Sequence, residues 1–133
     1  NLYIAGGGVF EIVPEFPDRW FNTAFIIGPD GNIALRYHKW HIPASIGLGT
    51  SPHDILDEYT KVFGSDIRTL FPVIDTEIGK LGTMTCHDGC TPEVSRALGY
   101  NGCEVISSGR PAGSRRRQRT LGLLAVHAPH ACA

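Results

Sequence analysis

The sequence predicts a mixed α/β domain, on the strength of three observations. Residues 80–98 combine a strand, a tight turn and a helix in direct succession, and residues 22–37 form a β-hairpin pattern. Sixteen glycines and nine prolines among 133 residues are typical of many turns between short strands. The sequence contains no internal repeat, no glycine-rich phosphate motif and no apolar run long enough to span a membrane.

The hairpin consists of two short strands around a turn. Asn22–Ile27 forms the first strand, Pro29–Asn32 (PDGN) supplies the turn residues, and Ile33–Tyr37 returns antiparallel. Lys39 follows the end of the return strand. A lysine at such a place is usually a solvated charge. Beside a reactive thiolate, however, it would provide a cationic donor to a developing oxyanion.

The strand–turn–helix unit places a cysteine at the strand end. Lys80–Thr85 carries β-compatible residues and leads into Cys86, and the residues His87–Gly89 turn the chain. Thr91 suits the N-cap of a following helix and Pro92 suits its first position. The apolar face of that helix consists of Val94, Ala97 and Leu98.

This position gives Cys86 two interpretations. A cysteine held at a tight turn lies near free backbone N–H groups, which stabilise a thiolate or an oxyanion. That geometry suits a nucleophile. The alternative is an ordinary buried cysteine at the end of a strand, and the local pattern leaves both interpretations open.

Taken together, these segments resemble the nitrilase superfamily of carbon–nitrogen hydrolases, in family order and spacing over about residues 1–108. The matching pieces are Phe21-Asn22-Thr23-Ala24, Ile27-Gly28-Pro29-Asp30-Gly31, Tyr37-His38-Lys39, His41-Ile42-Pro43, Phe71-Pro72-Val73-Ile74-Asp75-Thr76, Gly79-Lys80-Leu81-Gly82, Cys86-His87-Asp88, Pro92-Glu93, Arg96 and Gly102-Cys103-Glu104-Val105-Ile106. The resemblance implies part of a four-layer α-β-β-α sandwich with a Glu–Lys–Cys catalytic set. Carried over, Cys86 is the nucleophile, Lys39 stabilises the oxyanion, and the backbone N–H of His87 assists.

The resemblance assigns the glutamates less directly. The general-base glutamate of the family lies upstream of residue 1. Glu11 and Glu15 precede the hairpin and lie too close to Lys39, so we expect exposed loop charges there. Many family members use a second glutamate after the lysine, and Glu58 has similar spacing to the one in carbamoyl-amino-acid hydrolases. Asp57 is the alternative, and either residue could instead be a solvated charge on a loop or helix.

The chain divides by composition near residue 109. Residues 1–109 carry 7 basic and 13 acidic side chains, whereas residues 110–133 carry 5 arginines and no acid. We interpret 1–109 as the central part of a hydrolase domain, an internal fragment whose first five residues continue a strand. Residues 110–133 form an atypical tail, disordered or translated out of frame. A nucleic-acid patch is disfavoured, because the arginines are not interleaved with aromatic residues.

The predicted function is hydrolysis of an amide or N-carbamoyl C–N bond in a small molecule, through a thioester on the cysteine. Nitrile hydrolysis by the same site is one alternative. We expect no cofactor, no nucleic-acid or membrane partner, and a homo-oligomeric full-length parent. The 133-residue chain alone is expected to be inactive.

A different class of function is metal binding. Cys86, His87 and Cys90 lie close together in the sequence, and His38 and His41 are three residues apart. Zinc accepts such ligands, although the spacing fits no common zinc motif. The four cysteines are too sparse for a disulfide scaffold, which favours a reducing, cytoplasmic location.

Overall fold

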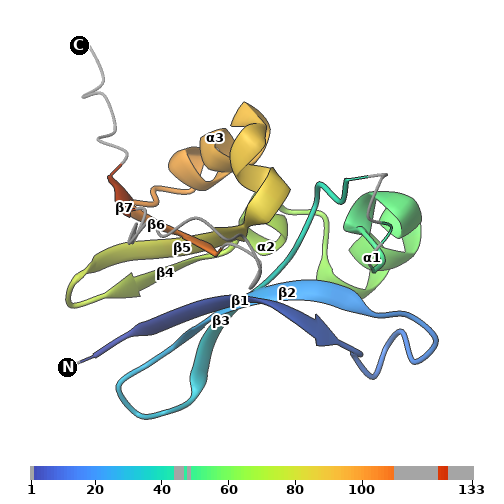
Figure 1. Ribbon diagram of the computed structural model, residues 1–133, viewed down its shortest axis with the longest axis horizontal. Helices are drawn as coiled ribbons and strands as arrows, with labels where there is room; N and C mark the ends of the chain where they lie inside the picture. Colours follow the sequence, from blue (N-terminus) through green and yellow to red (C-terminus); the bar gives the residue numbers. More distant parts are fainter. Residues whose placement is uncertain (1, 44–46, 48, 110–122, 126–133) are drawn as a thin grey trace, which may run out of the picture.

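The computed structural model describes residues 2–43, 47, 49–109 and 123–125, which form two small β-sheets with short helices (Figure 1). This arrangement confirms the predicted α/β class. The first sheet has the order β1 (Ile4–Glu11), β2 (Phe21–Ile27), β3 (Ile33–His38). The second has the order β4 (Val73–Thr76), β5 (Gly79–Thr85), β6 (Val105–Gly109), β7 (Leu123–Ala125). The helical segments are η1 (Pro52–Ile55), α1 (Leu56–Phe63), α2 (Ile67–Leu70), η2 (Cys86–Cys90) and α3 (Pro92–Tyr100).

The predicted hairpin is confirmed as the antiparallel pair β2–β3, within one residue at its ends. The backbone N–H of Gly28 donates to the carbonyl of Asn32, and the N–H of Gly31 donates to the carbonyl of Gly28. The carboxylate of Asp30 accepts from the backbone N–H of Asn32, which closes the turn locally. The return strand therefore ends immediately before Lys39, as predicted.

The predicted strand–turn–helix unit is also present, as β5, η2 and α3. After α3 the chain returns to β6, which pairs parallel to β5, and a parallel pair requires such a crossover. The predicted apolar face of the helix is buried: Val94 and Leu98 are fully enclosed and Ala97 nearly so. This packing fixes the helix against the sheet and thereby fixes the turn that carries Cys86.

The main core joins three layers in the order first sheet, second sheet, helix α3 (Figure 1). The first sheet contributes side chains such as Ile26 and Tyr37, the second contributes Leu81 and Ile106, and the helix contributes Leu98. Removal of this apolar surface from water is the main force that presses the layers together. The ends of β3 and β5 are consequently held in fixed relation, although the two strands belong to different sheets.

A second, smaller core anchors the segment that follows β3. Phe21 and Tyr59 pack with Val13 and Ile55, and partly buried Phe16 and Phe63 surround them. Here α1 and η1 pack against the first residue of β2. This cluster fixes the position of η1, which follows Ser51.

Two expectations for the N-terminal segment were wrong. The first strand begins at Ile4, so residues 2 and 3 precede it rather than continue a strand. Glu11 is the last residue of β1 and forms an ion pair with Arg36 at 3.2 Å, so it is not an exposed loop charge. The expectation of an atypical tail at 110–133 lies outside the described residues, apart from the short strand β7.

Candidate active site

Cys86 lies directly after β5 and begins the helical turn η2. Its φ of 52° is the only positive φ of a non-glycine residue among the described residues. This left-handed region is disfavoured for residues with a Cβ, and such strain is concentrated at functional sites. The residue is only half-buried. The strained backbone and incomplete burial favour the nucleophile over an ordinary buried cysteine.

Lys39 lies directly after β3, and its backbone N–H donates to the carbonyl of Asn22 at 2.8 Å. The residue is only 4% exposed, so the interpretation as a solvated charge is wrong. Within the described part of the chain, no carboxylate lies within 4 Å of its ammonium group. Burial of a charged group without a partner costs free energy. A lysine at this position therefore indicates a role for the charge itself.

Hydrogen bonds between His41 and Asp88 join the two segments. The backbone N–H of His41 donates to Oδ1 of Asp88 at 2.8 Å, and Nδ1 of the ring lies 3.2 Å from the same oxygen. Each residue is two positions after a predicted catalytic residue, Lys39 or Cys86. The structure thus brings together the two segments that the sequence singled out, across the boundary between the two sheets.

Tyr37 places a buried phenol beside the same carboxylate. Burial raises the pKa of Tyr37 well above its ordinary value, and the negative charge of neighbouring Asp88 raises it further. The hydroxyl therefore stays protonated throughout the ordinary pH range. Asp88 is itself completely buried, and with Tyr37 and partly exposed His41 it forms a polar cluster.

The side chain of Thr91 differs from its predicted role. Thr91 occupies the N-cap position of α3, but its hydroxyl makes no capping hydrogen bond to that helix. The hydroxyl instead donates to the backbone carbonyl of Asp88 at 3.2 Å and lies 3.2 Å from Nδ1 of His41. The Thr91 side chain therefore contacts the turn η2 and His41 instead of capping α3.

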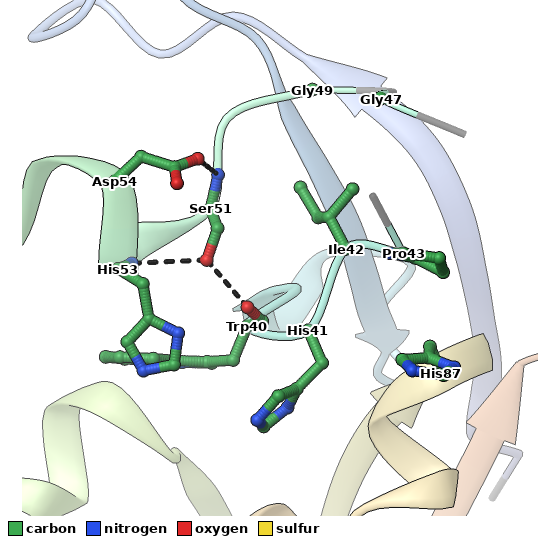
Figure 2. A pocket seen from close by; sticks show the side chains of 10 residues that line it. All are labelled: Trp40, His41, Ile42, Pro43, Gly47, Gly49, Ser51, His53, Asp54 and His87. Atoms are coloured by element: carbon green, nitrogen blue, oxygen red, sulfur yellow. Dashed lines mark hydrogen bonds between the residues drawn. The ribbon is translucent and has the colours of Figure 1, made fainter. Parts of the chain in front are cut away.

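A pocket of about 550 Å³ opens beside this cluster (Figure 2). Figure 2 shows Ser51 between the main chains of His53 and Trp40, and its hydroxyl donates to the Trp40 carbonyl at 2.6 Å. Three imidazole rings line the pocket together with the polar residues Ser51 and Asp54, and the other lining residues are apolar or glycine. The lining residues are Trp40, His41, Ile42, Pro43, Gly47, Gly49, Ser51, His53, Asp54 and His87.

The predicted oxyanion donor, His87, is the second residue of η2, and its side chain lines the pocket. Backbone N–H groups in the first turn of a helical segment have no acceptor within that segment. The N–H of His87 is therefore available to a negatively charged oxygen next to Cys86. This is a property of the turn rather than of the imidazole side chain.

The acidic candidates do not lie in this pocket. Glu58 and Asp57 are exposed in the first turn of α1, and neither lines the pocket. Glu15 is an exposed turn residue, as expected. Glu11 lies 3.6 Å from Nε2 of His38, at the end of β1. Within the described residues, neither Glu58 nor Asp57 forms an ion pair with Lys39.

The other described cysteines have different environments. Cys103 is buried, and burial raises the pKa of its thiol. Cys90 is exposed at the end of η2. Among residues that the structure describes, no group of three or more His, Cys, Asp or Glu side chains is arranged to hold a metal ion.

The sequence did not predict two hydrogen bonds of the site, from His41 to Asp88 and from Ser51 to Trp40. Asp88 was interpreted only as a turn residue, although an acid two positions after a candidate nucleophile is a usable signal. Ser51 begins the capping box of η1: its hydroxyl accepts from the backbone N–H of His53, and the Asp54 carboxylate accepts from the backbone N–H of Ser51. That sequence pattern, Ser-x-x-Asp, could have predicted the helical turn.

Comparison with known proteins identifies the class of the chain. The sequence pattern of the family described as carbon-nitrogen hydrolase matches residues 1–128. A formamidase of Helicobacter acinonychis (strain Sheeba) is 33% identical over 111 residues, covering 74% of this chain and 26% of that protein. A formamidase of Bacillus thuringiensis (strain Al Hakam) is 35% identical over 103 residues, with the same coverage of 74% and 26%. The chain spans about a quarter of the length of these curated relatives.

Comparison with solved structures supports the same class. A carbon-nitrogen hydrolase from Helicobacter pylori G27 superposes with a TM-score of 0.58 at 28% identity, covering 82% of this chain and 32% of that one. Saccharomyces cerevisiae Nit3, a member of branch 10 of the nitrilase superfamily, superposes with a TM-score of 0.56 at 21% identity, covering 84% and 35%. The chain therefore shares its fold with that member of the nitrilase superfamily. The chain belongs to the carbon–nitrogen hydrolase family.

None of the helices in the described residues is long and apolar enough to cross a membrane.

Proposed function

We propose that this chain supplies the nucleophile and the oxyanion-stabilising lysine of an amidase-type site, which hydrolyses a small amide or N-carbamoyl compound. The relatives named formamidase support a small amide as substrate. The single observation that carries the proposal is the strained, half-buried Cys86, tied through Asp88 and His41 to the segment of buried Lys39.

The chemistry follows from these positions. Sγ of Cys86 attacks the amide carbon and forms a tetrahedral intermediate, whose oxyanion is stabilised by the Lys39 ammonium and the backbone N–H of His87. The intermediate collapses to a thioester as the amine leaves. The general base takes the thiol proton and passes it to the departing nitrogen. Water then attacks the thioester, which releases the acid and restores the thiol.

The proton acceptor in this proposal is a glutamate that lies outside the described residues. The resemblance assigns it to a position before residue 1, and Glu58 is the second glutamate by spacing alone. Because Glu58 is exposed on α1, any role in this site requires a contact beyond those described. Nitrile hydrolysis would use the same cysteine through a thioimidate, and comparison of substrates separates the two reactions.

The test measures the reactivity of individual cysteines and then turnover. A limiting dose of iodoacetamide, followed by peptide mass spectrometry, should label Cys86 faster than Cys90, although Cys90 is the more exposed. Cys103 should stay unlabelled, because burial keeps its thiol protonated. In the full-length protein that carries this sequence, Cys86→Ser should abolish ammonia release from formamide and N-carbamoyl-alanine.

Cys90→Ser is the matched control, since it removes an exposed thiol from the same turn and should leave turnover unchanged. Preferential labelling of Cys90, or full turnover by Cys86→Ser, would refute the assignment of the nucleophile. Faster ammonia release from acetonitrile than from either amide would replace the amidase with a nitrilase.

A further inference from the structure

Asp88 is the only carboxylate among the described residues that is completely buried. A buried carboxylate is tolerated when hydrogen bonds replace the water that it loses. Here Oδ1 of Asp88 accepts from the backbone N–H of His41 at 2.8 Å and faces Nδ1 of its ring at 3.2 Å. Both contacts of this oxygen go to one residue on a distant segment, rather than to the turn in which Asp88 lies.

The network also assigns the proton of the His41 ring. The hydroxyl of Thr91 lies 3.2 Å from both the carbonyl of Asp88 and Nδ1 of His41, and it can accept from Nδ1 while it donates to the carbonyl. Asp88 Oδ1 is an acceptor as well. Nδ1 therefore carries the proton and donates between the two oxygens. Orientation of the ring is thus determined by the turn after Cys86.

The geometry relates this cluster to the proposed chemistry. His41 is two residues after Lys39, and Asp88 is two residues after Cys86. The two segments follow strands of different sheets, and the sheets are held together by packing of apolar side chains. Such packing is less directional than a hydrogen bond. A hydrogen bond between backbone and a buried carboxylate fixes distance and direction together.

We propose that Asp88 and His41 are positioning residues, which hold Lys39 and Cys86 at the separation required for attack and oxyanion stabilisation. This inference rests on the proposed function of Cys86 and Lys39. Neither Asp88 nor His41 exchanges a proton with the substrate in this scheme. They act by keeping the nucleophile and the cation aligned, and misplacement by about 1 Å costs on the order of 10²-fold in rate.

The experiment compares variants that keep or lose the donor at Nδ1. His41→Asn places an amide nitrogen near the position of Nδ1, whereas His41→Ala has no side-chain donor. His41 is partly exposed, with 26% of its side chain accessible, so both variants should fold. Thr91→Val removes only the third partner. Each variant is measured for thermal unfolding, for the ratio of Cys86 to Cys90 labelling by iodoacetamide, and for kcat and KM in the full-length protein.

We expect His41→Ala and Asp88→Asn to lower the labelling ratio and kcat by about 10-fold or more, with little change in KM. His41→Asn should recover most of both losses. Thr91→Val should have a smaller effect, because both the backbone and the ring hydrogen bonds from His41 to Asp88 remain.

A lower melting temperature with an unchanged labelling ratio and kcat would show a merely structural role and overturn the inference. Failure of His41→Asn to recover more than His41→Ala would also contradict it. These outcomes are distinct from failure of the proposed function, which would appear as turnover by Cys86→Ser with the wild-type cluster intact.

Discussion

His38 and Tyr59 meet in the smaller core, where Nδ1 of the imidazole lies 2.8 Å from the phenol oxygen. The ring also stacks on Phe21, with 4.5 Å between centroids. Burial lowers the pKa of His38 below its ordinary value, and Arg36 acts in the same direction, while Glu11 opposes the shift. The imidazole is therefore neutral in the native protein at neutral pH, although its neighbour Lys39 is a buried cation.

This arrangement predicts a loss of stability in mild acid. The unfolded chain protonates His38 near pH 6.5, whereas the native state resists protonation to a lower pH. The stabilising contribution is complete above about pH 6.5 and is lost as the pH falls from there toward the native pKa. Urea unfolding at pH 7.5 and 5.5 should show a lower midpoint at pH 5.5.

His38→Asn separates the contribution of His38 to the pH dependence from that of other titratable groups. The amide of asparagine can still form a hydrogen bond with Tyr59, but it does not titrate between pH 5.5 and 7.5. The variant should show a smaller difference between the two midpoints than the wild-type chain. His53→Asn, at an exposed histidine, should leave the difference unchanged. An equal pH dependence in His38→Asn and wild type would contradict the prediction.

The second prediction concerns Lys39. Lys39→Met replaces a buried cation with an apolar chain of similar length, so it should keep or raise the urea midpoint. The same change should slow labelling of Cys86 and reduce amide turnover by about 10²–10³-fold, as for loss of one oxyanion donor. Lys39→Arg should also lose turnover, since its larger planar group cannot replace a compact ammonium.

Lys61→Met, at an exposed position of α1, provides the control for loss of a positive charge and should change neither property. Equal labelling rates of Cys86 in Lys39→Met and wild type would exclude an electrostatic role for this lysine.

The third prediction compares two glycines. A Cβ added to Gly82 in β5 would lie 2.8 Å from Sγ of Cys103 and 3.2 Å from a methyl carbon of Leu98. Both neighbours are buried, so Gly82→Ala should destabilise the fold by about 1–3 kcal/mol. A Cβ at Gly99 in α3 meets nothing within 4 Å of the described residues, so Gly99→Ala should stabilise by about 0.5–1 kcal/mol. Chemical denaturation measures both, and equal effects would refute the close approach of α3 to β5.

Local chemistry explains which elements the sequence predicts correctly. The hairpin at β2–β3 follows from alternation of apolar residues around a Pro-Asp-Gly-Asn turn, and Cys86 follows from a strand that ends before a capped helix. These signals lie within a few residues of one another. The two predicted catalytic positions, Lys39 and Cys86, depend on the same local signals and on the family resemblance.

Contacts between distant segments explain the errors and omissions. Asp88 and His41 are 47 residues apart, so no local pattern reveals that one binds the other. Lys39 was open to interpretation as a solvated charge because lysine usually is one, and only the packing of two sheets buries it. Glu11 was placed in a loop because Arg36, its partner across the sheet, is not adjacent in sequence.

The hydrogen bond from the Ser51 hydroxyl to the Trp40 carbonyl joins two positions that are 11 residues apart in the sequence. Each doubling in length of a flexible closed loop costs only about 0.6 kcal/mol in closure entropy. Insertions between the two anchors would therefore alter the pocket wall at small cost to folding, while Trp40 and Ser51 keep their places. Changes of sequence between Trp40 and Ser51 should therefore reshape the pocket while Cys86 and its turn stay in place.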